Sequence, residues 1–187
     1  MTMQLDTTTR TNMATQLANA VAGGTMKLFS GAVPANCAAA DAAGLLAAGT
    51  LPNPALTAAS GATAISGTWS ATGSNGGTLA CFRLYDTTAI CRAQGSVGWT
   101  AQQGAWGPST VYAAGNTVSN GGNVYRCTTA GTSAASGGPT GTGTGIADGT
   151  AVWTYLGIVG DLNVDNTSIS TGQVLTDQTF TYTIGGA

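Results

Sequence analysis

Most of this chain consists of short segments in which β-branched or aromatic residues alternate with small polar ones, separated by Gly, Ser or Asn. Such segments cover 65–71, 78–85 and 89–97, and the pattern returns at 162–165 and 174–184. Successive side chains of a strand point to opposite faces, so a period of two predicts strands with one buried face. We therefore expect an all-β protein whose main domain is an antiparallel β-sandwich or jelly-roll-like barrel.

A single helix is expected, close to the N-terminus. Residues 9–22 place Met13, Leu17, Ala20 and Val21 on one helical face, and two Gly residues follow as a stop signal. Residues 26–30 then predict a strand. The Ala-rich stretch 35–54 is interrupted repeatedly by Gly and Pro, which favours a loop with one short strand or turn.

Charged residues are scarce. The 187 residues include five Lys plus Arg, seven acidic residues and no His, so the formal net charge is −2 and only 6% of residues are charged. An ordinary soluble domain has about 25% charged residues. With no basic patch, the chain is not expected to bind nucleic acid or a membrane surface. A surface with so few charges is typical of one that packs against identical neighbours.

Aromatic residues are concentrated between residues 105 and 157, among Gly, Asn, Ser and Thr. Two of the four Trp and three of the five Tyr lie in this segment, with only Arg126 and Asp148 charged. The order of its aromatic and Gly positions resembles that of the short chitin- and cellulose-binding modules of the type 5/12 class, copies of which recur in tailed-bacteriophage particle proteins. The matching positions are Trp106, Tyr112, Gly115, Val118, Tyr125 and Trp153.

This resemblance implies a fold that contacts sugars or surfaces. Aromatic rings stack on the apolar face of a pyranose, so Trp106, Tyr112, Tyr125 and Trp153 are the candidate glycan-binding residues. The alternative is that these rings form the core of a domain too small to have another. The core interpretation is favoured for Trp153 and Val124, which lie in alternating strand patterns. Both interpretations stay open for Trp106 and Tyr112.

The aromatic segment is predicted to be an insertion. Gly-rich residues 95–98 precede it and residues 157–162 follow, so removing the segment would join two strands through an ordinary short turn. Insertions succeed at exposed loop tips, where the chain ends lie close together. We expect a host domain of residues 1–98 and 159–187 and an inserted carbohydrate-binding-like module of residues 99–158.

The host segments resemble small structural proteins encoded among the virion genes of tailed bacteriophages. The resemblance lies in short motifs at 26–31, 81–86, 160–165 and 168–172, and in the final Phe-Thr-Tyr-Thr-Ile strand. It implies a protein present in many copies on the particle, either a capsid decoration (cement) protein or a tail-associated one.

Residues for catalysis are few. The chain has no His and no Glu, so Ser and Cys nucleophiles lack their usual base and only Lys27 could replace it. Asp161 and Asp165 would lie on one face of a strand about 13 Å apart, beyond the separation used by glycosidases. We expect no enzyme activity, no cofactor and no metal site.

The four cysteines, at 37, 81, 91 and 127, lack the spacings of zinc sites. If residues 79–85 pair with 89–96 as a hairpin, opposite residue numbers sum to 175, which places Cys81 and Cys91 on different faces. A bond between these two is therefore excluded. Free, mostly buried thiols are expected.

The predicted function is that of a bacteriophage virion structural protein, a capsid decoration (cement) protein on the outer surface of the particle after assembly in the host cytoplasm. Its expected partners are its own copies, with a trimer as the expected oligomer, and the major capsid protein or another virion protein. Through its module it would meet cell-surface polysaccharide. The alternative is a tail or fibre adhesion protein that binds host-surface glycan.

Overall fold

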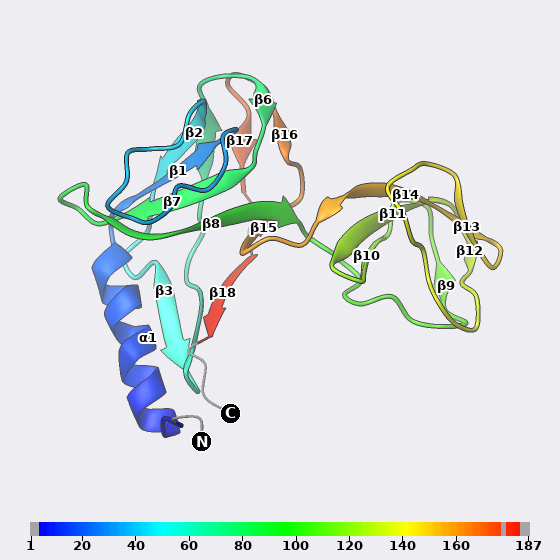
Figure 1. Ribbon diagram of the computed structural model, residues 1–187, viewed down its shortest axis with the longest axis horizontal. Coiled ribbons are helices and arrows are strands. Elements are labelled where there is room, and N and C mark those ends of the chain that lie inside the picture. Colours follow the sequence, from blue (N-terminus) through cyan, green and yellow to red (C-terminus); the bar gives the residue numbers. More distant parts are fainter. Residues whose placement is uncertain (1–3, 177–178, 184–187) are drawn as a thin grey trace. The chain divides into compact units, whose positions relative to one another are not determined.

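The computed structural model describes residues 4–176 and 179–183. The chain divides into two compact units, residues 1–97 with 160–187 and residues 98–159, which we call the host domain and the module. Their boundaries lie one residue from the predicted ones. Among the described residues both units consist of strands, and the host domain adds one helix near the N-terminus (Figure 1), which confirms the predicted all-β class with one N-terminal helix.

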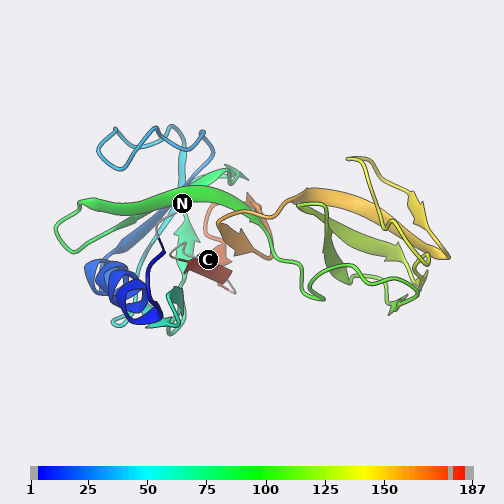
Figure 2. The same ribbon diagram turned by 60° about the horizontal axis from the view of Figure 1, so that its bottom comes forward.

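In the host domain, the described strands do not divide into two equal sheets. Ten of them form one sheet in the order β17-β5-β2-β1-β7-β8-β15-β18-β4-β3, and β6 pairs with β16 in a separate two-stranded ribbon. The sheet curls strongly (Figure 2). The bounds are α1 Thr7–Val21, β1 Thr25–Phe29, β2 Leu45–Thr50, β3 Leu56–Ala59, β4 Ala62–Ile65, β5 Ala71–Gly73, β6 Gly77–Thr78, β7 Cys81–Tyr85, β8 Cys91–Trp99, β15 Leu162–Val164, β16 Ser168–Ile169, β17 Val174–Leu175 and β18 Thr179–Thr183.

The module has its own small sheets. Four strands pair in the order β10-β11-β14-β13, and β9 pairs with β12. Its core is separate from that of the host domain and is rich in aromatic rings. The bounds are β9 Val111–Tyr112, β10 Thr117–Asn120, β11 Asn123–Thr129, β12 Gly131–Thr132, β13 Ile146–Asp148 and β14 Ala151–Ile158.

Helix α1 begins two residues before its predicted start. The carboxylate of Asp6 caps it by accepting hydrogen bonds from the backbone N–H groups of Thr8 and Thr9, at 2.9 and 3.1 Å. The face that packs against β3 and β4 is lined mainly by small residues, including Ala14 and Ala18, because small side chains let a helix approach a sheet closely. The predicted apolar face is therefore partly wrong: Met13 is 47% exposed.

Residues 65–71 do not form the single strand that the sequence predicts. β4 ends at Ile65 and β5 begins only at Ala71. Between them the indole of Trp69 is 2% exposed within the core, and its Nε1–H donates to the carbonyl of Ala55 at 2.8 Å. The apolar alternation in this segment thus reflects one buried ring rather than a continuous strand.

The hairpin of β7 and β8 forms as predicted but in a different register. Opposite residues such as Phe82 and Gly95 sum to 177, not 175. The loop is longer than assumed because Asp86 N–H bonds to the carbonyl of Ile90, and a bulge then adds one residue beside Tyr85. Up to Leu84 this shift is even and the faces are those predicted, but beyond the bulge Cys91 lies opposite Tyr85, a sum of 176. Cys91 therefore shares the face of Cys81, and the prediction that these two cysteines lie on different faces is wrong.

The Ala-rich stretch 35–54 contains one short strand, as predicted: β2, of six residues, pairs with β1 and β5. The C-terminal region differs from the sequence-based expectation. The segment predicted as one strand over 174–184 contains β17 and β18, which lie in distant positions of the sheet. Ile184, predicted to share a face with Phe180, lies outside the described residues.

Candidate functional site

Three of the four candidate glycan-binding rings are in the core of the module. Tyr112, Tyr125 and Trp153 are 5%, 1% and 0% exposed. Tyr112 packs edge-to-face against Trp153, with ring centroids 5.0 Å apart. A ring enclosed in this way has no free face to stack on a sugar. The burial therefore corrects the assignment of these three residues and favours the core interpretation for each.

Trp106, the fourth candidate, is half-buried and is tied into the same structure. Its Nε1–H donates to the carboxylate of Asp148 at 2.8 Å, and the indole N–H of Trp153 donates to the same oxygen at 3.1 Å. The other oxygen of Asp148 accepts from Ala134 N–H at 2.9 Å. Gly138 has a positive φ and lies so close to the Trp106 ring that an added Cβ would clash with it. The carboxylate of Asp148 thus links the indoles of Trp106 and Trp153 to the backbone of Ala134.

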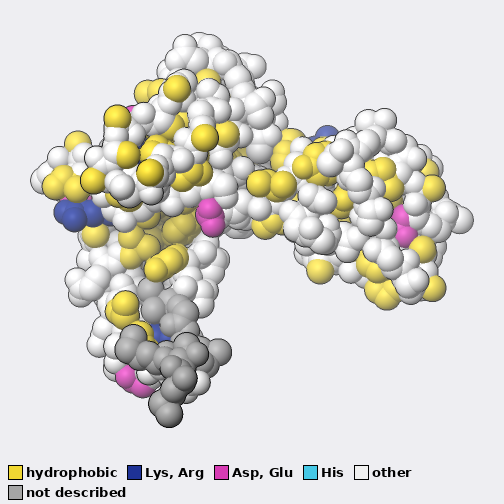
Figure 3. All heavy atoms as spheres, viewed as in Figure 1, with side chains coloured by type: hydrophobic (Ala, Val, Ile, Leu, Met, Phe, Trp, Pro, Cys, Tyr) yellow, Lys and Arg dark blue, Asp and Glu magenta, His cyan; other side chains and the backbone are white. Residues whose placement is uncertain are grey.

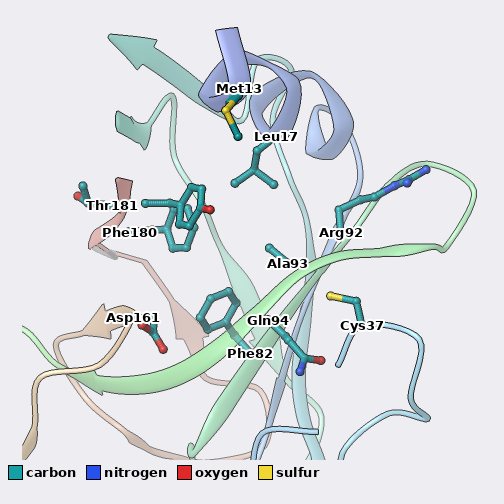
Figure 4. Close-up of a pocket in the computed structure, with 11 residues that line it drawn as sticks. Met13, Leu17, Cys37, Phe82, Arg92, Ala93, Gln94, Asp161, Phe180 and Thr181 are labelled. Atoms are coloured by element: carbon teal, nitrogen blue, oxygen red, sulfur yellow. The ribbon is translucent and has the colours of Figure 1, made fainter. Parts of the chain in front are cut away.

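A large hollow lies in the host domain. It is an open, mainly apolar groove of about 570 Å³ bounded by α1, β8 and β18. Figure 4 shows Met13 and Leu17 pointing into it from the helix, opposite Phe82 and Phe180. Phe82 and Phe180 are nearly fully buried and pack edge-to-face, with centroids 5.7 Å apart. Met13 and Tyr182, at 47% and 46% exposure, line the groove where solvent reaches it.

The polar groups that line this groove are largely engaged with other parts of the host domain. Arg92 forms an ion pair with Asp86 at 2.6 Å. Asp161 accepts from the backbone N–H and the hydroxyl of Ser96, both at 2.8 Å. The amide nitrogen of Gln94 donates to the carbonyl of Pro34, whereas its oxygen Oε1 is buried without a partner. The groove therefore offers mainly apolar surface.

One wall of the groove is fixed by a buried arginine. Arg83, on β7, is 1% exposed, and its guanidinium reaches the irregular segment 30–44. It donates to the carbonyls of Ala39 and Cys37 at 3.1 and 2.8 Å and to the Asp41 carboxylate at 2.7 Å. The planar fork of Arg suits several acceptors at once. The Arg83 side chain thus joins several points of segment 30–44 to the sheet.

Asp41 is the carboxylate at the centre of this attachment. Burial alone would raise its pKa, but hydrogen bonds from Tyr85 and Lys27 and the charges of Lys27 and Arg83 hold the pKa below its ordinary value. A carboxyl with a lowered folded-state pKa stabilises the protein above its unfolded pKa of about 3.9, and this contribution is lost as the pH falls through the folded-state value.

We therefore predict that near pH 6, roughly two units above that unfolded pKa, wild type has a larger free energy of unfolding than Asp41→Asn. The difference between the two free energies should decrease as the pH is lowered. Urea unfolding of the two proteins at a series of pH values measures this. Asp161→Asn, which has no cationic partner in the described structure, serves as the control. A gap of constant size down to the acid limit would contradict the prediction.

The cations and anions of the host surface largely neutralise each other. Lys27 and Arg83 both pair with Asp41, and Arg92 pairs with Asp86. The space-filling view accordingly shows few charged side chains on the face drawn, with hydrophobic side chains scattered between uncharged ones (Figure 3). Asp161 has no such ion pair within the described residues, so a neighbouring molecule that covers the groove would meet one unpaired charge.

The groove residues come from both ends of the chain, and the sequence did not indicate that they meet. The sequence showed the apolar helix face containing Met13 and the alternation of Phe180 with Tyr182, but no local pattern indicates that these two segments meet.

Among the described residues, no cluster of three or more potential metal ligands occurs, and no helix has the length and hydropathy of a membrane span. Comparisons with models of protein families, with curated proteins and with solved structures give no match to this chain.

Proposed function

We propose that this chain is a structural protein of a tailed-bacteriophage particle, a capsid decoration (cement) protein. Its host domain would anchor each copy to neighbouring copies and to the shell, and its module would be presented at the outer surface. The likeness of the host segments to virion structural proteins supports this proposal. The low charge and the open apolar groove of the host domain agree with it.

The observation that carries the proposal is the groove. Its apolar lining is partly exposed at Met13 and Tyr182. Of its two charged lining residues, Arg92 is paired with Asp86, and only Asp161 lacks an ion pair in the part of the chain that the structure describes. Burying apolar area contributes about 25 cal/mol per Å². We assign the groove to a second copy of this chain, because copies with so few free charges do not repel one another.

The connection between the two units supports the role of the module. The module enters the chain between β8 and β15, and these two strands are neighbours in the host sheet. The host sheet can therefore close whether or not the module is present, as in other tolerated domain insertions. A particle protein built this way can keep one anchor and carry a separate surface unit. Many copies of a modest contact give large total cohesion.

We predict that wild type forms a homo-oligomer and that Met13→Asp with Tyr182→Asp weakens its association at least about tenfold. Each substitution places a charge in the apolar contact and removes roughly 1 kcal/mol of burial. Light scattering coupled to size exclusion over a dilution series measures the effect. Val111→Asp on the module, at a residue 77% exposed, is the matched control and should not change the oligomer. A monomeric wild type, or a groove variant that assembles as strongly as the control, would refute the assignment.

The place on the particle is tested separately by quantitative mass spectrometry of purified virions. A copy number comparable to that of the major capsid protein is expected for a decoration protein. A copy number that matches a tail or fibre component would instead support the adhesion function.

A further inference from the structure

Two cysteines that are far apart in the sequence meet beside the groove. Cys37 and Cys91 are separated by 54 positions, and their Sγ atoms lie 2.8 Å apart. Both side chains are half-buried, whereas Cys81 and Cys127 are buried. The sulfur of a cysteine must approach its partner to about 2.05 Å to form a disulfide. The two sulfurs therefore need to move by less than 1 Å, roughly, for the bond to form.

Both cysteines are held in this position by other contacts. Cys91 is fixed on β8 opposite Tyr85 in the hairpin. Cys37 belongs to segment 30–44, and its own carbonyl accepts a hydrogen bond from the buried guanidinium of Arg83. The bond between Gln94 and the Pro34 carbonyl adds a second attachment nearby. Since both sides are already ordered, closing the bond costs little further conformational freedom.

We propose that Cys37 and Cys91 form an intramolecular disulfide that covalently locks segment 30–44 onto β8. The oxidant is a small-molecule disulfide such as oxidised glutathione. One of the two thiolates attacks a sulfur of the oxidant, forming a mixed disulfide and releasing one thiol. The second cysteine thiolate attacks the protein sulfur of that mixed disulfide, releasing the second thiol. Two protein thiols lose two protons and two electrons, and one oxidant disulfide is reduced to two thiols.

The surroundings of Cys37 and Cys91 favour formation of the disulfide late rather than early in the life of the protein. Burial, followed by the hydrogen bond and charge of Cys91, raises the pKa of the Cys37 thiol to about 11, against an opposing effect of the Arg83 guanidinium. The thiolate is the attacking species, so the pair reacts slowly near neutral pH. In a reducing cytoplasm it stays as two thiols, and an oxidising environment closes it.

The bond acts on the wall of the groove, because Cys37 lines it. Segment 30–44 is attached in the reduced protein by hydrogen bonds and ion pairs, which can open locally. A covalent link between Cys37 and β8 would keep this wall in place after the hydrogen bonds open. The existence of the bond does not depend on the proposed particle function.

The test begins with the unaltered full-length chain, incubated with oxidised glutathione at mildly alkaline pH and then alkylated. Trypsin leaves Cys37 and Cys81 together on residues 28–83 and places Cys91 on 84–92, so it cannot distinguish the two partners. A further digestion with chymotrypsin cuts after Trp69 and separates Cys37 from Cys81. Mass spectrometry is expected to find Cys37 linked to Cys91, with Cys81 and Cys127 alkylated after unfolding.

Variants and a second readout complete the test. Cys81→Ala should still form the bond, whereas Cys37→Ser and Cys91→Ser should each carry glutathione on the remaining cysteine of the pair. Oxidation should slow proteinase K cleavage within segment 30–44 by about tenfold in wild type and in Cys81→Ala only. Four alkylated cysteines in the oxidised wild type, or a link that involves Cys81, Cys127 or another molecule, would overturn the proposal. Should a Ser variant fail to fold, the linked peptide of the unaltered chain still decides it.

Discussion

Arg83→Ala is expected to lower the free energy of unfolding of the host domain by about 3–5 kcal/mol, because it removes several charge-assisted hydrogen bonds of a buried guanidinium. Arg83 is 1% exposed and donates to Asp41 and to carbonyl groups of segment 30–44. Without it the carbonyls of Ala39 and Cys37 lose this donor, Asp41 keeps only Lys27 and Tyr85, and segment 30–44 loses its main attachment to β7. Each charge-assisted hydrogen bond contributes roughly 1.5–3 kcal/mol, so the loss of several accounts for the size of the effect.

The measurement is urea unfolding of the full-length chain, with hydrogen–deuterium exchange read peptide by peptide to assign the change to the host domain. Arg83→Lys should recover only part of the stability, because an ammonium group cannot form the same planar fork. Arg92→Ala is the matched control on the same hairpin. The side chain of Arg92 is 43% exposed, so the loss there should stay below about 1 kcal/mol. Equal effects at the two positions would show that Arg83 does not organise the segment.

Trp153→Ala is expected to unfold the module while the host domain stays folded. Trp153 is 0% exposed, packs against Tyr112 and donates to Asp148. Truncating a buried Trp costs about 3–5 kcal/mol. A unit of roughly sixty residues buries a smaller fraction of its surface than a larger domain does and has little stability to lose. The substitution therefore removes most or all of the stability of the module.

Thermal melting and peptide-resolved hydrogen exchange distinguish the two units in this experiment. Rapid exchange should appear in β10, β11 and β14, and protection should persist in β1 and β7. Val111→Ala, at a residue 77% exposed, is the control and should change stability by less than about 0.5 kcal/mol. Loss of protection throughout the host domain would show that host and module unfold as one cooperative structure, contrary to the predicted insertion.

Local patterns predicted the elements of this fold better than their pairing. The helix, the hairpin of β7 and β8 and the all-β class follow from periodicity and from Gly stop signals. The hairpin register was wrong because a three-residue loop and a bulge each shift the pairing, and neither has a clear signature in this sequence. Trp69 was assigned to a strand because a buried ring and a strand residue look alike in an apolar alternation.

For the candidate sites too, the sequence identified the residues but not how they are placed in space. The sequence identified the aromatic residues of the module, but stacking on a ligand and packing in a core require the same side chains. Only burial distinguishes the two roles, and it places Tyr112, Tyr125 and Trp153 in the core. The sequence also predicted free thiols, but it placed Cys91 on the wrong face of the hairpin, because the bulge beside Tyr85 shifts its pairing by one residue. The approach of Cys37 to Cys91 depends on how Arg83 holds segment 30–44, and no spacing of cysteines encodes that.

The amino-acid sequence by itself determined the all-β class, the single helix and the scarcity of charge, because these depend on composition and on contacts between near neighbours in the chain. Only the tertiary structure decided which rings are enclosed, which cysteines meet and where an apolar groove stays open. Those features arise where α1, β8 and β18 come together from distant parts of the chain. Their positions are set by sheet order and register, which long-range packing fixes and local sequence does not.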